Sequence, residues 1–114
     1  MERRLVAILA ADVVGYSRQL GADEAGTMAR LRTLRTEVIE PLLAEHRGRL
    51  FKAMSDGFLA EFSSAVRAVT CAQAIQERMA ARNASALEGE RSELRIGLHA
   101  GDVLVEGMTL LAMG

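Results

Sequence analysis

An apolar run near the start of the chain constrains the fold more than any other feature. Residues 5–14 read LVAILAADVV and are all apolar except Asp12. Charged residues precede the run and Gly-Tyr-Ser follows it, which predicts a strand buried on both faces. Its longest uninterrupted stretch, residues 5–11, is too short to cross a bilayer, and Asp12 interrupts it where a secretory leader would stay apolar. We therefore expect a cytoplasmic chain without membrane insertion.

Length, charge and cysteine content narrow the class further. A length of 114 residues, half of them hydrophobic, suits one domain with its own core. A net charge of -1 gives no electrostatic basis for binding nucleic acid, so none is expected as a partner. The single cysteine, Cys71, excludes an intramolecular disulfide framework.

A long helical pattern follows the first strand. Asp23 is the expected N-cap, Pro41 is expected to kink or break the helix, and Gly48 is the stop signal. The predicted apolar stripe consists of Met28, Leu31, Leu34 or Arg35, Val38 and Leu42.

The next segment predicts a hairpin. Strands 49–54 and 58–62 flank the turn Ser-Asp-Gly, in which Gly57 can take a positive φ.

A second helix and a closing strand complete the pattern. Ser63 or Ser64 is the expected cap, residues 83–93 form a polar loop, and a strand from residue 94 ends in a turn at Gly101–Asp102 before another strand begins. The predicted buried face of the helix is Val66, Val69, Ala72 or Gln73, Ile75 or Gln76, and Met79. The order βαββαβ predicts an α+β, ferredoxin-like sandwich with helices on one face of an antiparallel sheet.

Two carboxylates stand out as candidates for chemistry. Asp12 interrupts a wholly apolar strand near its end, and Asp56 lies at the hairpin tip. We expect the first strand to run beside the strand after the first helix, so that both aspartates lie at one edge of the sheet. Paired carboxylates suit hard divalent cations, and two such ions could clamp a phosphoryl-type transfer. The main chain of residues 13–17 could cradle phosphates.

Each candidate also has an ordinary structural interpretation. Asp56 is first of all a turn residue, and Asp12 could cap a turn. The remaining cases are Lys52 as a solvated lysine, Cys71 as a packing residue, His46 as a helix-dipole partner and His99 as a structural residue.

Four blocks together resemble, in order and spacing, the catalytic domain of class III adenylate/guanylate cyclases. They are residues 3–31, 46–62, 65–83 and 94–107. The similarity is strongest to a bacterial adenylate cyclase subgroup whose first strand reads AILAADVVGYSR. It implies that the chain has the class III cyclase fold.

The resemblance assigns roles by position. Asp12, Asp56 and the carbonyl of Val13 would bind two Mg²⁺ or Mn²⁺ ions, although Ser55 replaces a family glycine. Lys52 matches the lysine that helps to select adenine. The residues matching the triphosphate contacts are Val14, Gly15, Tyr16 and Ser17. The implied reaction converts ATP to 3′,5′-cyclic AMP and pyrophosphate for signal transduction, and the implied assembly is a head-to-tail homodimer with its sites between subunits.

The last seven residues, MTLLAMG, fall outside the family pattern. We therefore divide the chain into a catalytic-domain part, 1–107, and a non-family tail, 108–114, for which no pairing partner is expected. The family's transition-state asparagine and arginine have no counterpart in that tail. This predicts a fold lacking its C-terminal elements and a truncated chain that is inactive alone.

Three alternatives remain open for such a chain. It could be a metal- and nucleotide-binding pseudoenzyme or the heterodimer partner of a complete cyclase. It could also be a non-functional frameshift fragment, because one codon choice for Asp-Asp-Leu-Ala-Gly-Asp-Gly, read one base later, encodes MTLLAMG.

Overall fold

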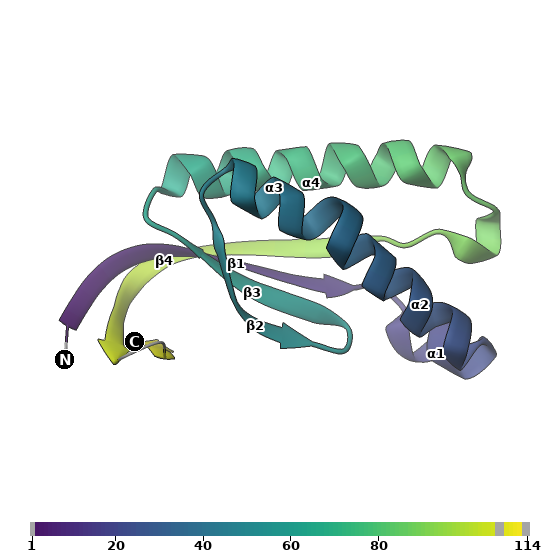
Figure 1. Cartoon of the computed structure of the whole chain (residues 1–114), viewed down its shortest axis with the longest axis horizontal. Coiled ribbons are helices and arrows are strands. Elements are labelled where there is room, and N and C mark those ends of the chain that lie inside the picture. The colour runs from purple at the N-terminus through teal and green to yellow at the C-terminus, as the bar shows by residue number, and fades with distance from the viewer. Residues whose placement is uncertain (1, 107–108, 113–114) are drawn as a thin grey trace.

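A computed structural model of the chain describes the backbone of residues 2–106 and 109–112 and the side chains of residues 4–101. Its helices lie together on one face of a twisted sheet (Figure 1). The described strands are β1 (Glu2–Val13), β2 (Arg49–Met54), β3 (Gly57–Phe62), β4 (Leu94–Glu106) and β5 (Thr109–Ala112). The described helices are α1 (Tyr16–Ala22), α2 (Glu24–Leu34), a π-helical turn η1 (Arg35–Ile39), α3 (Glu40–Glu45), α4 (Ala65–Ser85) and a 3-10 turn η2 (Glu88–Glu90).

The described strands form one sheet in the order β2-β3-β1-β4-β5, and every pairing in it is antiparallel. The predicted ferredoxin-like α+β arrangement is therefore confirmed. The expected neighbour of β1 was wrong, however. β1 lies between β3 and β4, and β2 lies at the sheet edge, because the hairpin places β3 between β2 and β1.

β1 alternates between two environments. Ala7, Leu9 and Ala11 face the helices and are buried, whereas Ile8 and Ala10 on the other face are only half-buried. Burial on both faces was thus predicted correctly only at Val6, which is buried on the other face as well; elsewhere the helices cover one face only. The other face, called the open face below, has no helix packed on it in the described part of the chain (Figure 1).

β4 continues through the predicted turn. Val6 pairs with Gly101 and Leu5 with Asp102, so the turn expected there was wrong. The long partner β1 supplies pairing positions along the whole segment, which keeps β4 extended. Residues 109–112 pair as β5 with residues 103–106, which also corrects the expectation that the tail has no partner. Residues 107, 108, 113 and 114, and with them the proposed boundary between 107 and 108, lie outside the described residues.

The first helical region is distorted where Pro41 predicted it. Pro41 lacks an N–H and its ring excludes the carbonyl one turn earlier, and the π-helical turn η1 directly precedes α3. At the start of α2, the Asp23 Oδ1 accepts a hydrogen bond from the Gly26 N–H at 3.0 Å, so the predicted N-cap is confirmed.

Gly48 does not end the helix, contrary to the prediction. α3 already ends at Glu45, and Arg47 takes the left-handed conformation with φ 59°. Gly48 is needed for packing instead, because a Cβ there would lie 2.5 Å from the ring of Phe62.

The core lies between the helices and the sheet. α4 buries Ala68, Cys71, Ile75 and Met79, and this confirms Cys71 as a packing residue. Val66 and Val69 were predicted to be buried but are 75% and 44% exposed, and Met28 on α2 is 45% exposed. Small residues decide the choice of face on α4. Ala68 and Cys71 pack in one cluster with sheet residues Ala7, Ala11 and Ala60, which allows a close approach.

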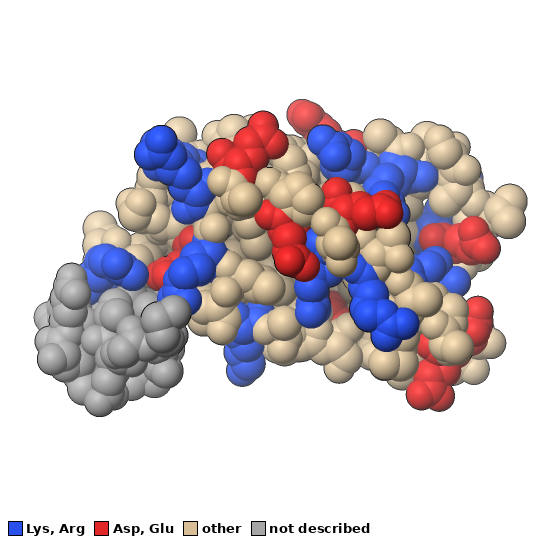
Figure 2. Space-filling model, in the orientation of Figure 1, with Lys and Arg blue, Asp and Glu red and all other residues tan. Residues whose placement is uncertain are grey.

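Two surface properties complete the description. The face seen in Figure 2 mixes Lys and Arg with Asp and Glu rather than gathering one sign of charge. Within the described ranges, no helix combines the length and the apolar character needed to cross a bilayer.

Candidate functional site

Asp12 lies on the open face at the end of β1. Its neighbours Ala11 and Val13 point into the core, so strand alternation turns Asp12 away from the helices. The side chain is 45% exposed, and its Oδ1 accepts a 2.9 Å hydrogen bond from the Arg95 Nε. An aspartate in this apolar strand is therefore tolerated because it is partly solvated and already paired with a cation.

Asp56 contacts the end of β1 through its main chain, and we call the place where Asp12, Val13 and Asp56 meet the aspartate corner. The Asp56 carbonyl accepts a 2.7 Å hydrogen bond from the Val13 N–H, which ties the hairpin tip to the end of β1. The backbones of the two aspartate segments thus meet at one end of the sheet, as predicted, although β3 rather than β2 adjoins β1.

Gly57 is what permits this approach. Its φ is not positive, so the predicted reason for glycine was wrong. A Cβ at Gly57 would instead lie 2.1 Å from the carbonyl oxygen of Ala11. Glycine allows the β1 and β3 backbones to come this close.

The loop after Asp12 is tightly held. The Val14 N–H donates to the Glu93 carbonyl at 2.9 Å, and Gly15 has φ 70° before α1 begins. Ser17 is exposed, whereas the Tyr16 side chain packs against the core, so only the main chain of Tyr16 is placed to meet a ligand at this loop.

Lys52 is on the open face but is not beside Asp12. It is exposed on β2, opposite Leu59 of β3, and β1 is the next strand along the sheet. Since neighbouring strands are about 4.8 Å apart, β2 and β1 are separated by about 10 Å. Within one chain, Lys52 and Asp12 therefore belong to different parts of the open face.

The sequence pattern missed two arginines at this corner. Arg95 is paired with Asp12 across the β1–β4 register, and Arg18 of α1 lies over Gly15. The strand pattern placed Arg95 at the start of a strand, but only the register shows which residue it faces.

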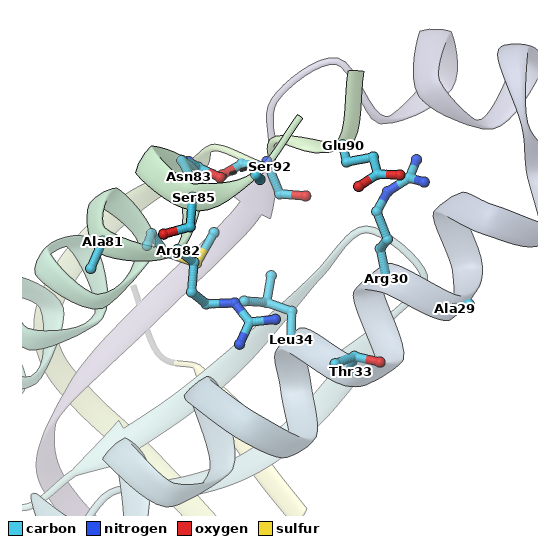
Figure 3. Close-up of a pocket in the computed structure, with 12 residues that line it drawn as sticks. Ala29, Arg30, Thr33, Leu34, Ala81, Arg82, Asn83, Ser85, Glu90 and Ser92 are labelled. Atoms are coloured by element: carbon cyan, nitrogen blue, oxygen red, sulfur yellow. Dashed lines mark hydrogen bonds between the residues drawn. The ribbon is translucent and has the colours of Figure 1, made fainter. Parts of the chain in front are cut away.

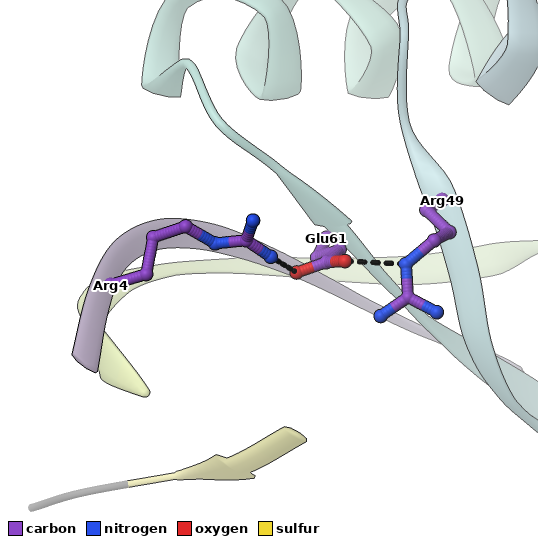
Figure 4. A network of polar contacts seen from close by, with 3 residues as sticks. All are labelled: Arg4, Arg49 and Glu61. Atoms are coloured by element: carbon purple, nitrogen blue, oxygen red, sulfur yellow. Dashed lines mark hydrogen bonds and ion pairs between the residues drawn. The ribbon is translucent and has the colours of Figure 1, made fainter. Parts of the chain in front are cut away.

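A further charged network lies on the open face (Figure 4). Glu61 of β3 is nearly buried, and its two carboxylate oxygens accept hydrogen bonds from Arg4 of β1 and Arg49 of β2. The network joins three neighbouring strands, and we interpret it as structural.

The two histidines lie apart from the Asp12 corner. His46 is at the C-cap of α3 and its Nδ1 is 2.8 Å from the Leu42 carbonyl, which agrees with the predicted position at a helix C-terminus. His99 is exposed on β4, opposite Ile8. Burial and, to a smaller extent, Glu45 raise the pKa of the Cys71 thiol to about 11, which fits a packing residue rather than a nucleophile.

The hollows of the surface do not coincide with the two aspartates. A pocket of about 660 Å³ lies between α2 and the end of α4, on the helix side (Figure 3). Arg30, Thr33, Arg82 and Glu90 are among its lining residues. The hollow that does include Asp56 is also lined by Leu31, Leu34 and Ile39, so it lies on the helix side, and it holds only about 30 Å³. The Asp12–Asp56 corner is therefore an open surface rather than an enclosed pocket.

The donor chemistry of this corner fits a hard divalent cation. Asp12, Asp56 and the Val13 carbonyl offer only oxygen donors, which Mg²⁺ and Mn²⁺ accept. Among the residues described, no three His, Cys, Asp or Glu side chains gather as a metal cluster. Further ligands would have to come from water or from a bound molecule, which is usual for Mg²⁺.

The chain is similar to known nucleotide cyclases. It is 49% identical, over all of its 114 residues, to a protein of Rhizobium meliloti (strain 1021) named "Putative adenylate cyclase 3", of which it spans 19%. No family model matches the chain.

Solved structures agree with the sequence similarity. The adenylate/guanylate cyclase/hydrolase of Silicibacter pomeroyi is 39% identical with a TM-score of 0.86, and the match covers 98% of this chain and 64% of that one. The guanylate cyclase domain of RhGC from Catenaria anguillulae, solved in complex with GTP, shares the fold at 18% identity with a TM-score of 0.78, over 100% of this chain and 69% of that one. The chain thus spans about two thirds of these cyclase structures. The chain belongs to the class III adenylate/guanylate cyclase family.

Proposed function

We propose that these 114 residues form the metal- and triphosphate-binding part of a class III adenylate cyclase site. The observation that supports the proposal is the main-chain hydrogen bond from the Val13 N–H to the Asp56 carbonyl, which joins the hairpin tip to the end of β1. Asp12 already pairs with a cation there, the guanidinium of Arg95.

Each residue of the corner would have one task. Asp12, Asp56 and the Val13 carbonyl would hold two Mg²⁺ or Mn²⁺ ions, which when bound supply charge neutralisation and a lowered pKa for the ribose 3′-hydroxyl. The loop of Val14, Gly15, Tyr16 and Ser17 would orient the triphosphate through its main chain.

The reaction would be attack of the ribose 3′-oxygen on the α-phosphorus of ATP. The bond between the α-phosphorus and the oxygen that bridges it to the β-phosphate breaks, the 3′-hydroxyl gives its proton to water, and pyrophosphate leaves as cyclic AMP forms. Arg95 is 73% exposed, so its guanidinium can turn from Asp12 toward phosphate oxygens without leaving a packed site.

A second subunit would complete the purine subsite. Lys52 and Asp12 share the open face but lie two strands apart, which supports a head-to-tail dimer in which Lys52 of one copy meets Asp12 of the other. Half-buried Ile8, Ala10 and Leu59 give that face an apolar centre. ATP is proposed over GTP on the basis of Lys52, although the Catenaria relative was solved with GTP.

Turnover would also use groups outside the metal- and triphosphate-binding part. The asparagine and arginine that the family places in the transition state have no counterpart in residues 108–114. Loss of one preorganised contact of this kind costs about 10²–10³ in rate.

The test is complementation. The chain would be mixed with the Silicibacter cyclase carrying alanine at its two matching aspartates, with Mn²⁺ and ATP, and cyclic AMP would be measured. We expect cyclic AMP from the mixture only and its loss with Asp12→Ala. The control Arg78→Ala, which changes an exposed residue of α4, should have no effect. Cyclic AMP that survives Asp12→Ala would contradict the assignment of the metal half. ATP binding without any product in the mixture would reduce the function to nucleotide binding.

A further inference from the structure

Arg18 of α1 is placed directly over the loop that follows Asp12. A Cβ added to Gly15 would lie only 2.8 Å from a terminal nitrogen of the Arg18 guanidinium. The guanidinium therefore occupies the space where any other residue at position 15 would carry its side chain. Gly15 also has φ 70°, a left-handed conformation that favours glycine whatever the position of Arg18.

Arg18 forms no ion pair within the described part of the chain, although carboxylates line the same hollow. The side chain is exposed, and none of the ion pairs among the described side chains involves it. Arg95, on the other side of the corner, is paired with Asp12. Arg18 is thus a cation that is available to an anion arriving at this loop.

There is also room for a ligand beside Arg18. Arg18 lines a hollow of about 550 Å³ together with Gln19, Arg30 and Arg91. Asp23, Glu88 and Glu90 line it too, but none of them is within ion-pair distance of Arg18. A chain of phosphates leaving the Asp12 corner over Gly15 would reach the guanidinium at the edge of this space.

We infer that Arg18 is a positioning residue that binds the terminal phosphates of the nucleotide. This inference rests on the proposed function, because that function supplies the triphosphate. If the triphosphate follows the loop from Asp12 past Gly15, its α-phosphate would lie near the aspartates and its β- and γ-phosphates near Arg18. Arginine suits this task because its planar group can bind two phosphate oxygens at once.

The experiment compares nucleotides that differ only in phosphate number. Displacement of a fluorescent methylanthraniloyl-ATP by ATP, ADP and AMP would be measured with Mn²⁺ for the parent chain, Arg18→Ala, Arg18→Lys and the exposed control Arg78→Ala. A hydrogen-bonded arginine–phosphate contact is worth about tenfold in affinity. We expect Arg18→Ala to weaken ATP about tenfold, ADP less and AMP hardly at all, with partial recovery in Arg18→Lys and no change in Arg78→Ala.

Two failures can be told apart. If the parent chain binds ATP and Arg18→Ala binds it equally well, or loses ATP and AMP in the same proportion, the role of Arg18 is refuted while the proposed function stands. If neither ATP, ADP nor AMP displaces the fluorescent nucleotide from the parent chain, the proposed triphosphate site itself is refuted and this inference falls with it. Circular dichroism melting of each variant shows that the compared proteins are folded.

Discussion

Replacing Gly57 with alanine tests how the two aspartate segments are held together. The added Cβ would lie 2.1 Å from the Ala11 carbonyl oxygen, and real Cβ contacts essentially never fall below 3.0 Å. β1 and β3 would have to separate by about 1 Å, because the obstacle is backbone rather than a flexible side chain. The separation acts on the central pairing of the sheet and on the hydrogen bond from Val13 to Asp56.

The magnitude follows from this geometry. Overpacking of this kind costs about 2–3 kcal/mol, which for a chain of this size lowers Tm by about 10 °C. Gly97→Ala is the matched control. Gly97 lies on β4, the other neighbour of β1, and an added Cβ there would have no atom within 4 Å. Its φ is not positive either. Gly97→Ala should change stability by less than about 0.5 kcal/mol.

The assay is urea unfolding followed by circular dichroism, with Mn²⁺-ATP affinity measured on the same variants. Gly57→Ala should lose both stability and affinity, and Gly97→Ala should keep its stability. Equal stability of the two alanine variants would refute the close approach of β1 and β3 as the reason for glycine.

Three further perturbations have definite expected outcomes. Burial raises the pKa of Cys71 to about 11, so the native thiol should resist Ellman's reagent at pH 8. The free energy of unfolding should fall as pH rises from about 9 to about 11, because in that range the unfolded thiol ionises and the folded one does not. A Cys71→Ala variant with the same pH profile would disprove this. Glu61→Gln should lose about 1–2 kcal/mol in urea unfolding, because a nearly buried carboxylate between Arg4 and Arg49 loses its charge; unchanged stability would mean that the network contributes nothing. Arg95→Gln should bind Mn²⁺ about two- to fivefold more tightly in a titration, because the guanidinium no longer competes with the ion for Asp12 and the exposed pair is worth at most about 1 kcal/mol. Weaker binding would show that Arg95 supports the ion instead.

Local signals were reliable where the chemistry is local. The Asp23 cap, the distortion at Pro41 and the Ser64 cap, which accepts from the Arg67 N–H, follow from hydrogen bonds within one turn of chain. The strand and helix order followed from periodicity and was enough to predict the α+β fold.

Errors arose where the answer depended on distant partners. Val66 and Val69 form as good a helical stripe as Ala68 and Cys71, and only the close approach of the sheet decides between them. Gly101 resembles a turn until the length of β1 is known as its partner.

The candidate site was predictable only in part. Asp12 and Asp56 could be found because one interrupts an apolar strand and the other ends a hairpin. Arg18 and Arg95 could not, because their neighbours at Gly15 and Asp12 come from side-chain placement and strand register.

Metal-dependent nucleotide binding would show whether Asp12 and Asp56 together hold a divalent cation. The affinity of the chain for ATP would be measured by calorimetry with and without Mn²⁺, for the parent chain, Asp12→Asn, Asp56→Asn and the remote control Arg78→Ala. The expected result is that Mn²⁺ strengthens ATP binding in the parent and the control, and that this strengthening is at least tenfold smaller in Asp12→Asn and in Asp56→Asn. Equal Mn²⁺-dependent binding in all four proteins would contradict it.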